Sequence, residues 1–475
     1  MFKNLKEAQK FIKDYEIEFI DFKMIDLKGR FRHLSIPSEN LNEEVMKYGI
    51  GFDGSNYGYA AVEKSDMVFI PDLTSACVDP FIEAPTLSMM GDVMVIGEKE
   101  NTPFNQYPRN ITKAALSYMK KEKVADEMII GPEYEFHLFT GIERKISPNN
   151  VSYNLSCEES YWESDEPISF GYHNQKGSGY HIDNPIDMAM DARNEICNNL
   201  KEFGVDVKYH HHEVGGSGQQ EVEVSLGEMS KLADDTLWSK YVIRNTAKEF
   251  GFSATFMPKP IYGEAGNGMH VHMLLKKNNK PIFYADNTYG NLSKTAMYFM
   301  GGILKHVKAL CAFTNPSTNS YKRLVPGFEA PVTIGYAMAN RSSVIRIPSY
   351  AKSKDAKRFE LRSPDATCNP HFAYSAILMA GIDGVKNKID PKDYNWGPFD
   401  KDLFSLSDKE KAKLEHLPTS LEEAIKELEK DHDFLMVGGV FPKELIETWI
   451  KSLKKDLEYV NKVPHPCEID LYYDL

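Results

Sequence analysis

The sequence contains no apolar run long enough to cross a bilayer, which argues against a membrane-spanning protein. Its first residues, 1–15, mix charged and apolar side chains as an amphipathic helix does, a pattern unlike that of a secretory signal. The six cysteines are scattered and none forms a Cys-x-x-Cys pair, which argues against a disulfide framework. Together these absences predict a cytoplasmic protein that has no membrane partner.

The chain also lacks an excess of positive charge, because acidic residues outnumber basic ones and the net charge is −13. A chain without a basic field is a poor nucleic-acid binder, and it must meet an anionic ligand such as ATP with local arginines and metal ions. The sequence has no P-loop, protein-kinase signature, Gly-x-Gly-x-x-Gly turn or nucleophile elbow. If the chain uses a nucleotide, it must therefore bind it with a fold that lacks these nucleotide-binding signatures.

The length of 475 residues favours two domains, because a single core rarely grows that large. Residues 18–37 predict a β-hairpin with a Lys-Gly turn, and further short strands make residues 1–105 a small sheet-rich domain. The proline-punctuated stretch 102–108 predicts a linker to a second domain, residues 106–475.

The second domain shows patterns typical of both helices and strands. Asn110 is predicted to cap a helix that ends near Lys121. Residues 140–180 have little periodicity and are predicted to be loop-rich, while residues 315–331 are polar and proline-punctuated, as functional loops are. The other expected elements are strands at 67–71, 92–96 and 128–139, and helices at 187–203, 229–250, 292–312, 370–386, 420–431 and 443–458.

One stretch, His210–Val224, concentrates residues that can do chemistry. It begins with three histidines and Glu213, passes through a glycine- and serine-rich turn, and continues as an alternating strand in which Glu221 and Glu223 share a face. Acids on both sides of a glycine turn suit a hard divalent cation, which takes carboxylate oxygens from converging segments. Taken alone, a solvated loop followed by an edge strand explains the stretch equally well.

The same alternation occurs in three other segments. Residues 133–138 carry acids at alternate positions, residues 269–273 carry histidines, and residues 358–362 carry Arg, Glu and Arg. Side chains at i and i+2 of a strand share a face, and a single charged face usually means solvent. Four such faces with almost no lysine are predicted to form the walls of one site. The arginines support this prediction, because a rigid, planar guanidinium group pairs well with phosphate and carboxylate.

These faces carry acids and a histidine but no thiolate, a set that favours Mg²⁺ or Mn²⁺ over zinc. Arginines beside divalent ions are typical of phosphoryl transfer, in which charge neutralisation at the moving phosphate dominates. The residues alone therefore predict a metal-dependent, ATP-using enzyme with a carboxylate substrate. The candidate residues are Glu133, Glu135, Glu213, Glu221, Glu360, His270, Arg323, Arg341, Arg346, Arg358 and Arg362.

A set of short motifs resembles type I glutamine synthetase. The motifs cover almost the whole chain in the family's order, and jointly they are highly specific. They are Phe-Asp-Gly-Ser at 52–55, Gly-Pro-Glu-Tyr-Glu-Phe at 131–136, His-His-Glu-Val at 211–214, Gly-Gln-Gln-Glu at 218–221, Phe-Met-Pro-Lys-Pro at 256–260, Gly-Asn-Gly-Met-His-Val-His at 266–272, and the segments 319–331, 340–348 and 358–365.

The resemblance implies an α+β fold, with an N-terminal β-grasp domain and a catalytic domain whose curved antiparallel sheet, flanked by helices, forms a funnel-shaped active site. It implies a dodecamer of two hexameric rings with active sites shared between neighbouring subunits. The implied reaction joins ammonia to the γ-carboxylate of glutamate through γ-glutamyl phosphate, giving glutamine, ADP and phosphate. ATP would be the co-substrate, with two or more Mg²⁺ or Mn²⁺ ions in each active site.

The resemblance also implies a role for each matching residue. Asp53, reaching in from the adjacent subunit, would take a proton from ammonium, and Glu329 would lie on a flap that keeps water from the intermediate. The other implied roles are Glu135, Glu213 and Glu221 for one metal; Glu133, His270 and Glu360 for the other; Gly266, Arg323 and Arg362 for glutamate; and His272, Arg341, Arg346 and Arg358 for ATP and the transferred phosphoryl group.

Four positions depart from the family's pattern. Asn56 replaces the usual second serine beside the ammonium base, and Leu274 replaces a serine near the nucleotide. Asp355 stands where a lysine is common. Phe404 stands where some members carry a modifiable tyrosine, so regulation by adenylylation is not expected.

Two alternatives to ammonia ligation are consistent with the motifs. A relative that uses a larger amine, such as a polyamine or ethanolamine, would share the metal, ATP and glutamate sites. Asp53 and Glu329 favour ammonia over such an amine, whereas Asn56 is a departure at the same place. A catalytically inactive homologue would be expected to have lost metal ligands, and all six candidates are present.

Overall fold

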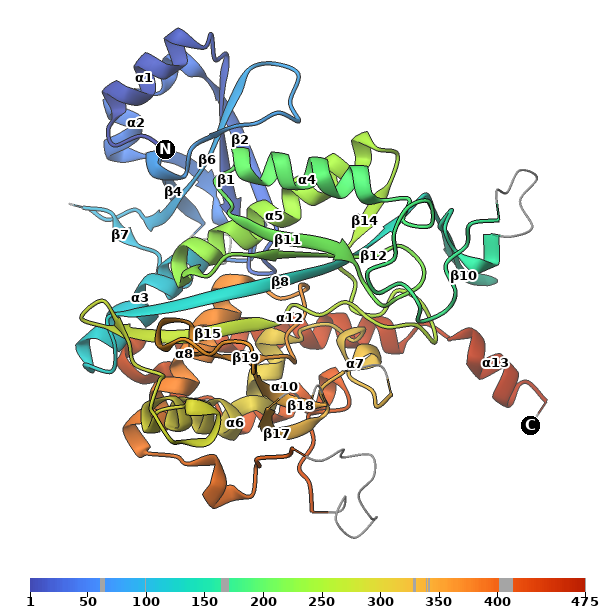
Figure 1. Cartoon of the computed structure of the whole chain (residues 1–475). Coiled ribbons are helices and arrows are strands. Elements are labelled where there is room, and N and C mark those ends of the chain that lie inside the picture. Colours follow the sequence, from blue (N-terminus) through green and yellow to red (C-terminus); the bar gives the residue numbers. More distant parts are fainter. Residues whose placement is uncertain are drawn as a thin grey trace.

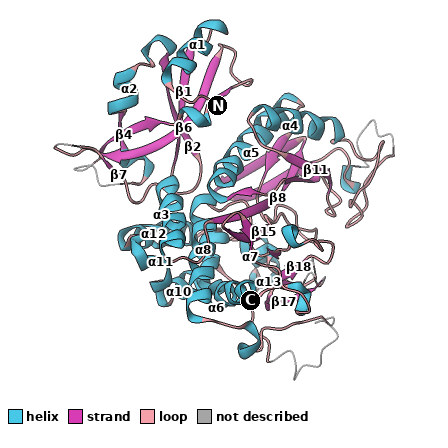
Figure 2. Ribbon diagram, turned by 60° about the vertical axis from the view of Figure 1, so that its left-hand side comes forward, coloured by secondary structure: helices cyan, strands magenta, loops and turns pink. Residues whose placement is uncertain are grey.

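The computed structural model describes residues 1–59, 65–98, 100–163, 171–327, 330–338, 340, 342–400 and 413–474. These residues form a sheet-rich N-terminal unit and a larger unit in which helices pack around a second sheet (Figure 1). Figure 2 shows the N-terminal strands set apart from the second sheet, with α3 (Pro108–Lys121) leading from one to the other. The fold is α+β, as the sequence predicts.

The N-terminal sheet has the strand order β2-β1-β6-β4-β3, in which β1 and β6 are parallel and the other neighbours are antiparallel. The predicted hairpin is confirmed as β1 and β2. The stretch predicted as a linker is partly wrong, because its first two residues form β7 and pair with β6. The elements are α1 (Leu5–Asp14), β1 (Phe19–Ile25), β2 (Phe31–Pro37), α2 (Glu43–Tyr48), β3 (Ile50–Asp53), β4 (Asp66–Pro71), β5 (Cys77–Val78), β6 (Thr86–Val95) and β7 (Thr102–Pro103).

The turn between β1 and β2 rests against the larger unit. Asp26 accepts the N–H of Lys28 at 3.0 Å through its Oδ1 atom, which fixes the turn. Gly29 has a φ of 72°, and a Cβ atom there would lie 2.8 Å from the Cα atom of Asn369. The side chain of Asn369 donates to the Leu27 carbonyl at 3.1 Å. The turn therefore requires glycine both for its backbone angle and for this close approach.

The second sheet has the strand order β11-β12-β8-β15-β19-β18-β17. Its neighbours are antiparallel except for the parallel β17–β18 pair. All four alternating segments of the sequence lie in this one sheet. The strands are β8 (Glu127–Phe139), β11 (Val207–His212), β12 (Gln219–Val224), β13 (Gly227–Glu228), β14 (Ser253–Thr255), β15 (Val271–Lys277), β16 (Lys280–Pro281), β17 (Thr333–Met338), β18 (Ser343–Ile347) and β19 (Phe359–Leu361).

The two faces of β8 have different environments. Tyr134 is fully buried, and its hydroxyl lies 3.0 Å from Oγ1 of Thr236 on α5 (Met229–Glu249). Thr236 in turn lies 3.0 Å from the hydroxyl of Tyr374 on α8 (Pro370–Asn387). Glu133 and Glu135 flank Tyr134 in sequence, so the strand geometry turns them to the opposite face. Helices therefore hold the sheet on one side and leave the carboxylates on the other.

The predicted helices are present, although α2, α11 (Asp433–Met436) and α13 (Pro466–Tyr472) were not predicted and the start of α3 differs from the prediction. Asn110 is not the cap of α3, because the helix begins at Pro108 and Asn110 instead donates to the Phe104 carbonyl at 2.9 Å. None of the helices in the described ranges is long and apolar enough to span a membrane. The remaining helices are α4 (Met190–Glu202), α6 (Lys294–Thr314), α7 (Ser320–Arg323), α10 (Leu421–Lys430) and α12 (Lys443–Asn461).

Two segments predicted as loops contain regular structure. Residues 141–156 form a hairpin of β9 (Gly141–Ser147) and β10 (Asn150–Ser156), although region 140–180 was expected to be loop-rich. The hairpin is mostly exposed, so it lacks the apolar alternation of a strand with one buried face. The predicted loop 315–331 includes the short helix α7.

Arg109 of α3 is buried and joins the two units through ion pairs. Its Nη2 atom lies 2.8 Å from Asp72 and 3.0 Å from Asp234, and its Nη1 atom lies 3.4 Å from Asp92. Nε2 of His371 also approaches Asp234, at 3.2 Å. Burial alone would raise the pKa of the Asp234 carboxyl, but Arg109 and His371 lower it to about 2.

We expect the Asp234→Asn variant to be less stable than the parent chain by about 2 kcal/mol at neutral pH. Because the folded pKa is depressed, this contribution is present above the ordinary value of 3.8 and is lost as the pH falls through about 2. Melting temperatures measured from pH 7 to strongly acidic pH should therefore converge for the two proteins. A difference that stays constant over this range would contradict the assignment.

Candidate active site

The strand register places the polar side chains in a row across the sheet. Glu221 of β12 lies opposite Glu135 of β8, and Glu223 lies opposite Glu133. Further along the row, β19 pairs with β15 on one side and with β18 on the other. Glu360 of β19 lies opposite His272 of β15 and opposite Arg346 of β18. Residues from five strands thus converge on one face of the sheet.

A single cavity brings most of the predicted residues together. All six predicted metal ligands line it, and so do the glycine and three of the arginines predicted to bind substrate or nucleotide. The predicted residues that line it are Glu133, Glu135, Glu213, Glu221, His270, Glu360, Gly266, Arg323, Arg346 and Arg362.

Glu133, His270 and Glu360 form a first cluster, in which one ligand atom from each residue lies within 4.8 Å of the others. Nδ1 of His270 lies 2.8 Å from Oε2 of Glu133 and 3.7 Å from Oε1 of Glu360. Burial alone would raise the pKa of Glu133, but hydrogen bonds from His270 and His272 lower it well below its ordinary value. The carboxylate is therefore ionised.

Glu360 is also the counterion of two arginines. Its Oε2 atom accepts from Arg346 at 2.8 Å, and its Oε1 atom accepts from Arg362 at 2.5 Å. Burial by itself would raise the pKa of Glu360, and the Arg362 guanidinium is the largest influence that lowers it. Glu360 thus fixes the positions of two cationic side chains while it faces His270.

His211, Glu213 and Glu221 form a second cluster within the same 4.8 Å limit. The His211 ring lies 3.6 Å from Glu213 and 3.6 Å from Glu221. Burial, followed by the charges of Glu133, Glu135 and Glu213, raises the pKa of Glu221 well above its ordinary value. Mutually repelling carboxylates of this kind, with an imidazole beside them, fit divalent cations such as Mg²⁺ or Mn²⁺.

Glu135 lies between the two clusters. Its Oε2 atom accepts the N–H of Gly268 at 2.7 Å, and its Oε1 atom lies 3.7 Å from Nε2 of His270. The structure thus places His211, rather than Glu135, within 4.8 Å of both Glu213 and Glu221. The assignment of Glu135 to that metal stays a prediction.

Arg323 is buried and held by the backbone of the segment that directly follows β19. Its guanidinium donates to the Ser363 carbonyl at 2.9 Å and to the Arg362 carbonyl at 3.2 Å, and it lies 3.3 Å from Nε2 of His270. Gly266 packs against Arg323, since a Cβ atom there would lie 3.0 Å from Cγ of the arginine. The guanidinium therefore faces the cavity in a fixed orientation, which suits a carboxylate ligand.

Arg358 and His272 lie behind the cavity wall. Arg346 and Arg358 lie on the ring of Tyr350, with centroid distances of 5.9 and 5.5 Å. His272 points its Nε2 atom at Oε1 of Glu133, 2.9 Å away. Both residues thus contact groups that line the cavity.

Of the three predicted catalytic residues, only Asp53 lies within the described part of the chain. Asp53 lies on the exposed end of β3 in the N-terminal unit and does not line the cavity. Glu329 and Arg341 lie outside the described residues, as does Phe404. Their roles therefore stay predictions.

The structure adds residues that the sequence interpretation left out of the site. His211, Tyr180, Tyr209 and Tyr350 line the cavity, and Glu223 lies beside Glu133. The alternation of β12 already placed Glu223 on the face of Glu221, so this residue was recognisable. The sequence does not identify the three tyrosines as site residues, because an aromatic residue in a loop or strand is usually part of a core.

Two family models match the chain in succession. "Glutamine synthetase, beta-Grasp domain" matches residues 16–96, and "Glutamine synthetase, catalytic domain" matches residues 105–472. The fold and the cavity therefore define a β-grasp domain followed by a catalytic domain of this class, which confirms the predicted fold.

Full-length relatives show the same membership. A glutamine synthetase of Frankia alni is 42% identical over 480 residues, covering 100% of both chains, and one of Haemophilus influenzae is 43% identical over 471 residues, covering 98% of both. The solved structure of Plasmodium falciparum glutamine synthetase superposes with a TM-score of 0.87 at 30% identity over 99% of both chains, and a GmaS/ADP complex with 0.82 at 26% over 100% of both. The chain belongs to the glutamine synthetase family, and the predicted enzyme class is confirmed.

Proposed function

We propose that this chain ligates ammonia to the γ-carboxylate of L-glutamate through γ-glutamyl phosphate, converting ATP to ADP and phosphate. The observation that carries the proposal is one cavity in which two carboxylate–histidine clusters lie beside buried arginines. The full-length glutamine synthetase relatives support this reaction. The similar GmaS structure, solved as an ADP complex, supports a nucleotide as co-substrate.

The chemistry explains why acids and arginines are needed together. A carboxylate does not condense with an amine in water, because its oxygen is a poor leaving group, so the γ-carboxylate must first be phosphorylated. When bound, Mg²⁺ or Mn²⁺ ions would neutralise the charge of the phosphates that approach this carboxylate. We assign one ion to Glu133, His270 and Glu360, and another to Glu135, Glu213 and Glu221, with His211 beside it.

The arginines divide between the two substrates. Arg323 and Arg362 bind and orient the glutamate, and Gly266 lets it approach the backbone. We assign Arg346 and Arg358, which both lie on the ring of Tyr350, to the ATP phosphates. We also assign His272 to the binding of ATP and Arg341 to the transferred phosphoryl group.

The acceptor step needs a base, because ammonium is not a nucleophile until it loses a proton. We assign this role to Asp53 of a neighbouring copy, with Glu329 on a flap that excludes water. Asp53 accepts from the Ser55 hydroxyl at 2.7 Å and from the Asn56 amide at 2.9 Å. The hydrogen bonds from Ser55 lower the pKa of the Asp53 carboxyl, so it is ionised at neutral pH.

The exposed position of Asp53 supports an active site shared between subunits. We propose a dodecamer of two hexameric rings, in which the domain of residues 1–105 reaches the catalytic domain, residues 106–475, of the next subunit. The family-model matches, which end at residue 96 and resume at residue 105, support this division. Six free cysteines support a reducing, cytoplasmic location.

The proposed reaction is tested by coupling ADP release to an optical assay, with glutamate and one amine at a time. Ammonium should give turnover, and hydroxylamine should replace it as a small nucleophile. Polyamines and ethanolamine should give little ADP. Turnover with a larger amine but not with ammonium would overturn the proposal.

Divalent ions should stabilise the chain as well as activate it. At about 100 times its dissociation constant, one ion bound only to the folded state adds about 2.7 kcal/mol. We therefore expect Mg²⁺ or Mn²⁺ to raise the melting temperature by several degrees, and EDTA to reverse this and abolish activity. Glu221→Gln should reduce the rise, and an unchanged metal response in this variant would contradict the second cluster.

Mixed oligomers test the shared active site. Asp53→Ala and Glu360→Gln should each be nearly inactive alone. If each site takes Asp53 from a neighbour, random one-to-one assembly after co-expression restores about one quarter of the wild-type activity. No recovery in verified hybrid oligomers would place both residues in the same subunit's site.

A further inference from the structure

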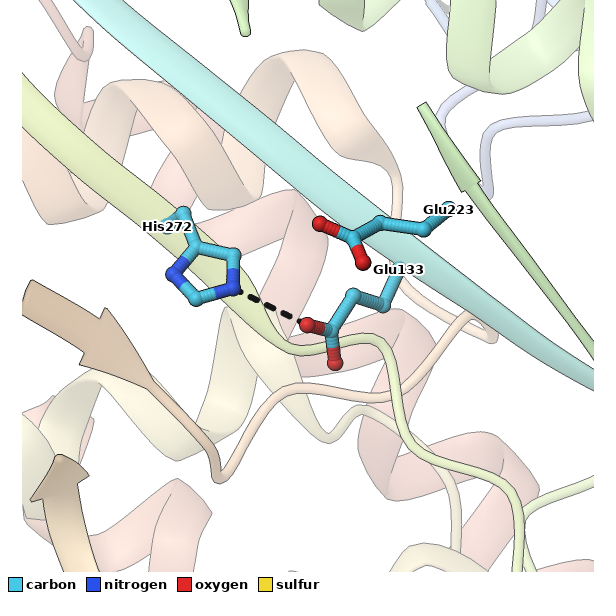
Figure 3. A group of neighbouring side chains, drawn as sticks. All are labelled: Glu133, Glu223 and His272. Carbon is cyan, nitrogen blue, oxygen red and sulfur yellow. Dashed lines mark hydrogen bonds and ion pairs between the residues drawn. The ribbon is translucent and has the colours of Figure 1, made fainter. Parts of the chain in front are cut away.

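The acids that lie on strands are positioned by the sheet, whereas Glu213 is not. Figure 3 shows Glu133 and Glu223 next to each other on the β8–β12 pair, with the ring of His272 facing Glu133. The same pairing of β12 with β8 places Glu221. Glu213 comes directly after the last residue of β11 and belongs to the turn between β11 and β12. Contacts from outside the sheet must therefore hold this member of the second cluster.

The turn itself has little conformational preference of its own. Three of its five residues 214–218 are glycine, the residue with the greatest backbone freedom. Two hydrogen bonds to Gln219 hold the turn on the side of β12, from the N–H of Glu213 to the backbone carbonyl at 2.8 Å and from the N–H of Gly215 to Oε1 at 2.7 Å. The opposite side of the turn packs against Glu159.

Glu159 is a buried carboxylate that does not line the cavity and has no part in the proposed reaction. It is 3% exposed. Its Oε1 atom accepts the N–H of Gly218 at 2.6 Å and lies 2.7 Å from Nε2 of His212. His212 is the last residue of β11, and Gly218 directly precedes β12. One carboxylate oxygen therefore contacts both ends of the turn.

The ring of His212 extends this contact to Glu213. Its Nδ1 atom lies 2.7 Å from the backbone carbonyl oxygen of Glu213, while its Nε2 atom faces Glu159. His212 is 1% exposed, and a buried ring with both nitrogens hydrogen-bonded cannot rotate without losing both partners. The backbone of Glu213 is thus fixed by a chain of contacts that begins at Glu159.

We propose that Glu159 is a positioning residue for the second cluster, because through His212 and Gly218 it fixes the turn that carries Glu213 and leads to Glu221. Glu159 touches neither an ion nor a substrate in this role. The inference rests on the divalent ion assigned to this cluster under the proposed function, but on no step of the ligase reaction. An outer residue that orients metal ligands contributes about 10- to 100-fold in metal affinity.

The competing explanation is that Glu159 only stabilises the fold. Its backbone carbonyl accepts from the N–H of Asn174 at 2.6 Å, but that bond does not depend on the side chain. The Oε2 atom accepts only distantly from the N–H of Met188, at 3.5 Å. The two short contacts of the carboxylate are those to His212 and Gly218, so its side chain acts mainly on the turn.

Manganese binding to the full-length chain, without nucleotide or substrate, tests the proposal. Wild type, Glu159→Ala and Glu158→Ala would be titrated with Mn²⁺ and followed by electron paramagnetic resonance and equilibrium dialysis. Glu159→Ala should bind the ion of the second cluster about 10- to 100-fold more weakly and keep its affinity for the ion of the first. Glu158 is the exposed neighbour of Glu159, so Glu158→Ala is the matched control and should bind Mn²⁺ as wild type does.

Two further variants separate positioning from a general loss of structure. In a Glu221→Gln background the second cluster has already lost a ligand, so adding Glu159→Ala should not weaken the remaining ion any further. Glu159→Gln keeps an acceptor oxygen for Gly218, so it should retain the Mn²⁺ affinity of wild type within a few-fold. If circular dichroism shows that Glu159→Ala does not fold, Glu159→Asp, which is too short to reach both ends of the turn, should weaken the same ion.

Unchanged affinity in a folded Glu159→Ala variant, or in Glu159→Asp where that variant replaces it, would overturn the proposal. Equal weakening of both ions would overturn it as well, because it would show that Glu159 acts through the whole fold. The ligase assay is read separately. A wild-type chain that binds Mn²⁺ as expected but gives no ammonium-dependent turnover would overturn the proposed reaction and leave the role of Glu159 standing.

Discussion

The Glu360→Gln variant is expected to lose roughly three orders of magnitude in kcat. Glu360 faces His270 in the first metal cluster and accepts from both Arg346 and Arg362. Glutamine keeps the shape but removes the charge, so one metal site loses a ligand and two arginines lose their counterion. Steady-state ADP release at saturating glutamate, ATP and ammonium measures the loss.

The matched control is Glu127→Gln, because Glu127 is the first residue of β8 and lies outside the cavity. We expect it to keep kcat within about twofold of wild type, as surface substitutions do. A Glu360→Gln variant that is folded and retains a tenth or more of the wild-type kcat would contradict the role assigned to Glu360.

The Arg323→Lys variant is expected to raise KM for glutamate about 100-fold, with a smaller change in KM for ATP. Arg323 is held by two backbone carbonyls and faces the cavity beside His270. Lysine keeps the charge but cannot reproduce the planar fork that pairs with a carboxylate. KM values for the two substrates, measured separately, distinguish this result from a general loss of activity.

Arg323→Lys should also lower the melting temperature by a few degrees, because the carbonyls of Ser363 and Arg362 lose donors. Arg144→Lys, on the exposed strand β9, is the control and should change neither KM nor stability. An equal rise in KM for glutamate and for ATP would show that Arg323 acts through the fold rather than through the glutamate site.

Much of this site was predictable because it is built on strands of alternating polarity. Side chains at i and i+2 share a face, so the acids at 133, 135, 221 and 223 could be assigned to one side of their strands before any pairing was known. The antiparallel pairing of β8 with β12 then placed these acids opposite one another. The long, periodic helices such as α5 and α8 were likewise recognisable from their pattern.

Other features depend on contacts that a local pattern does not carry. The β9–β10 hairpin is exposed on both faces and so lacks the alternation of a strand packed on a core. Helix α3 begins at Pro108, and the Asn110 side chain donates to the Phe104 carbonyl instead of capping the helix. Likewise, His211 lies beside Glu221 because the antiparallel pairing of β11 with β12 sets the two residues opposite each other.

The central claim is that carboxylates and imidazoles from separate strands hold the divalent ions beside which the phosphoryl group moves. Crystals grown with Mn²⁺ and ADP, measured at the manganese absorption edge, locate these ions. We expect anomalous peaks in contact with Glu133, His270 and Glu360, and with Glu213 and Glu221. Manganese peaks confined to other parts of the chain, with none in this cavity, would contradict the central claim.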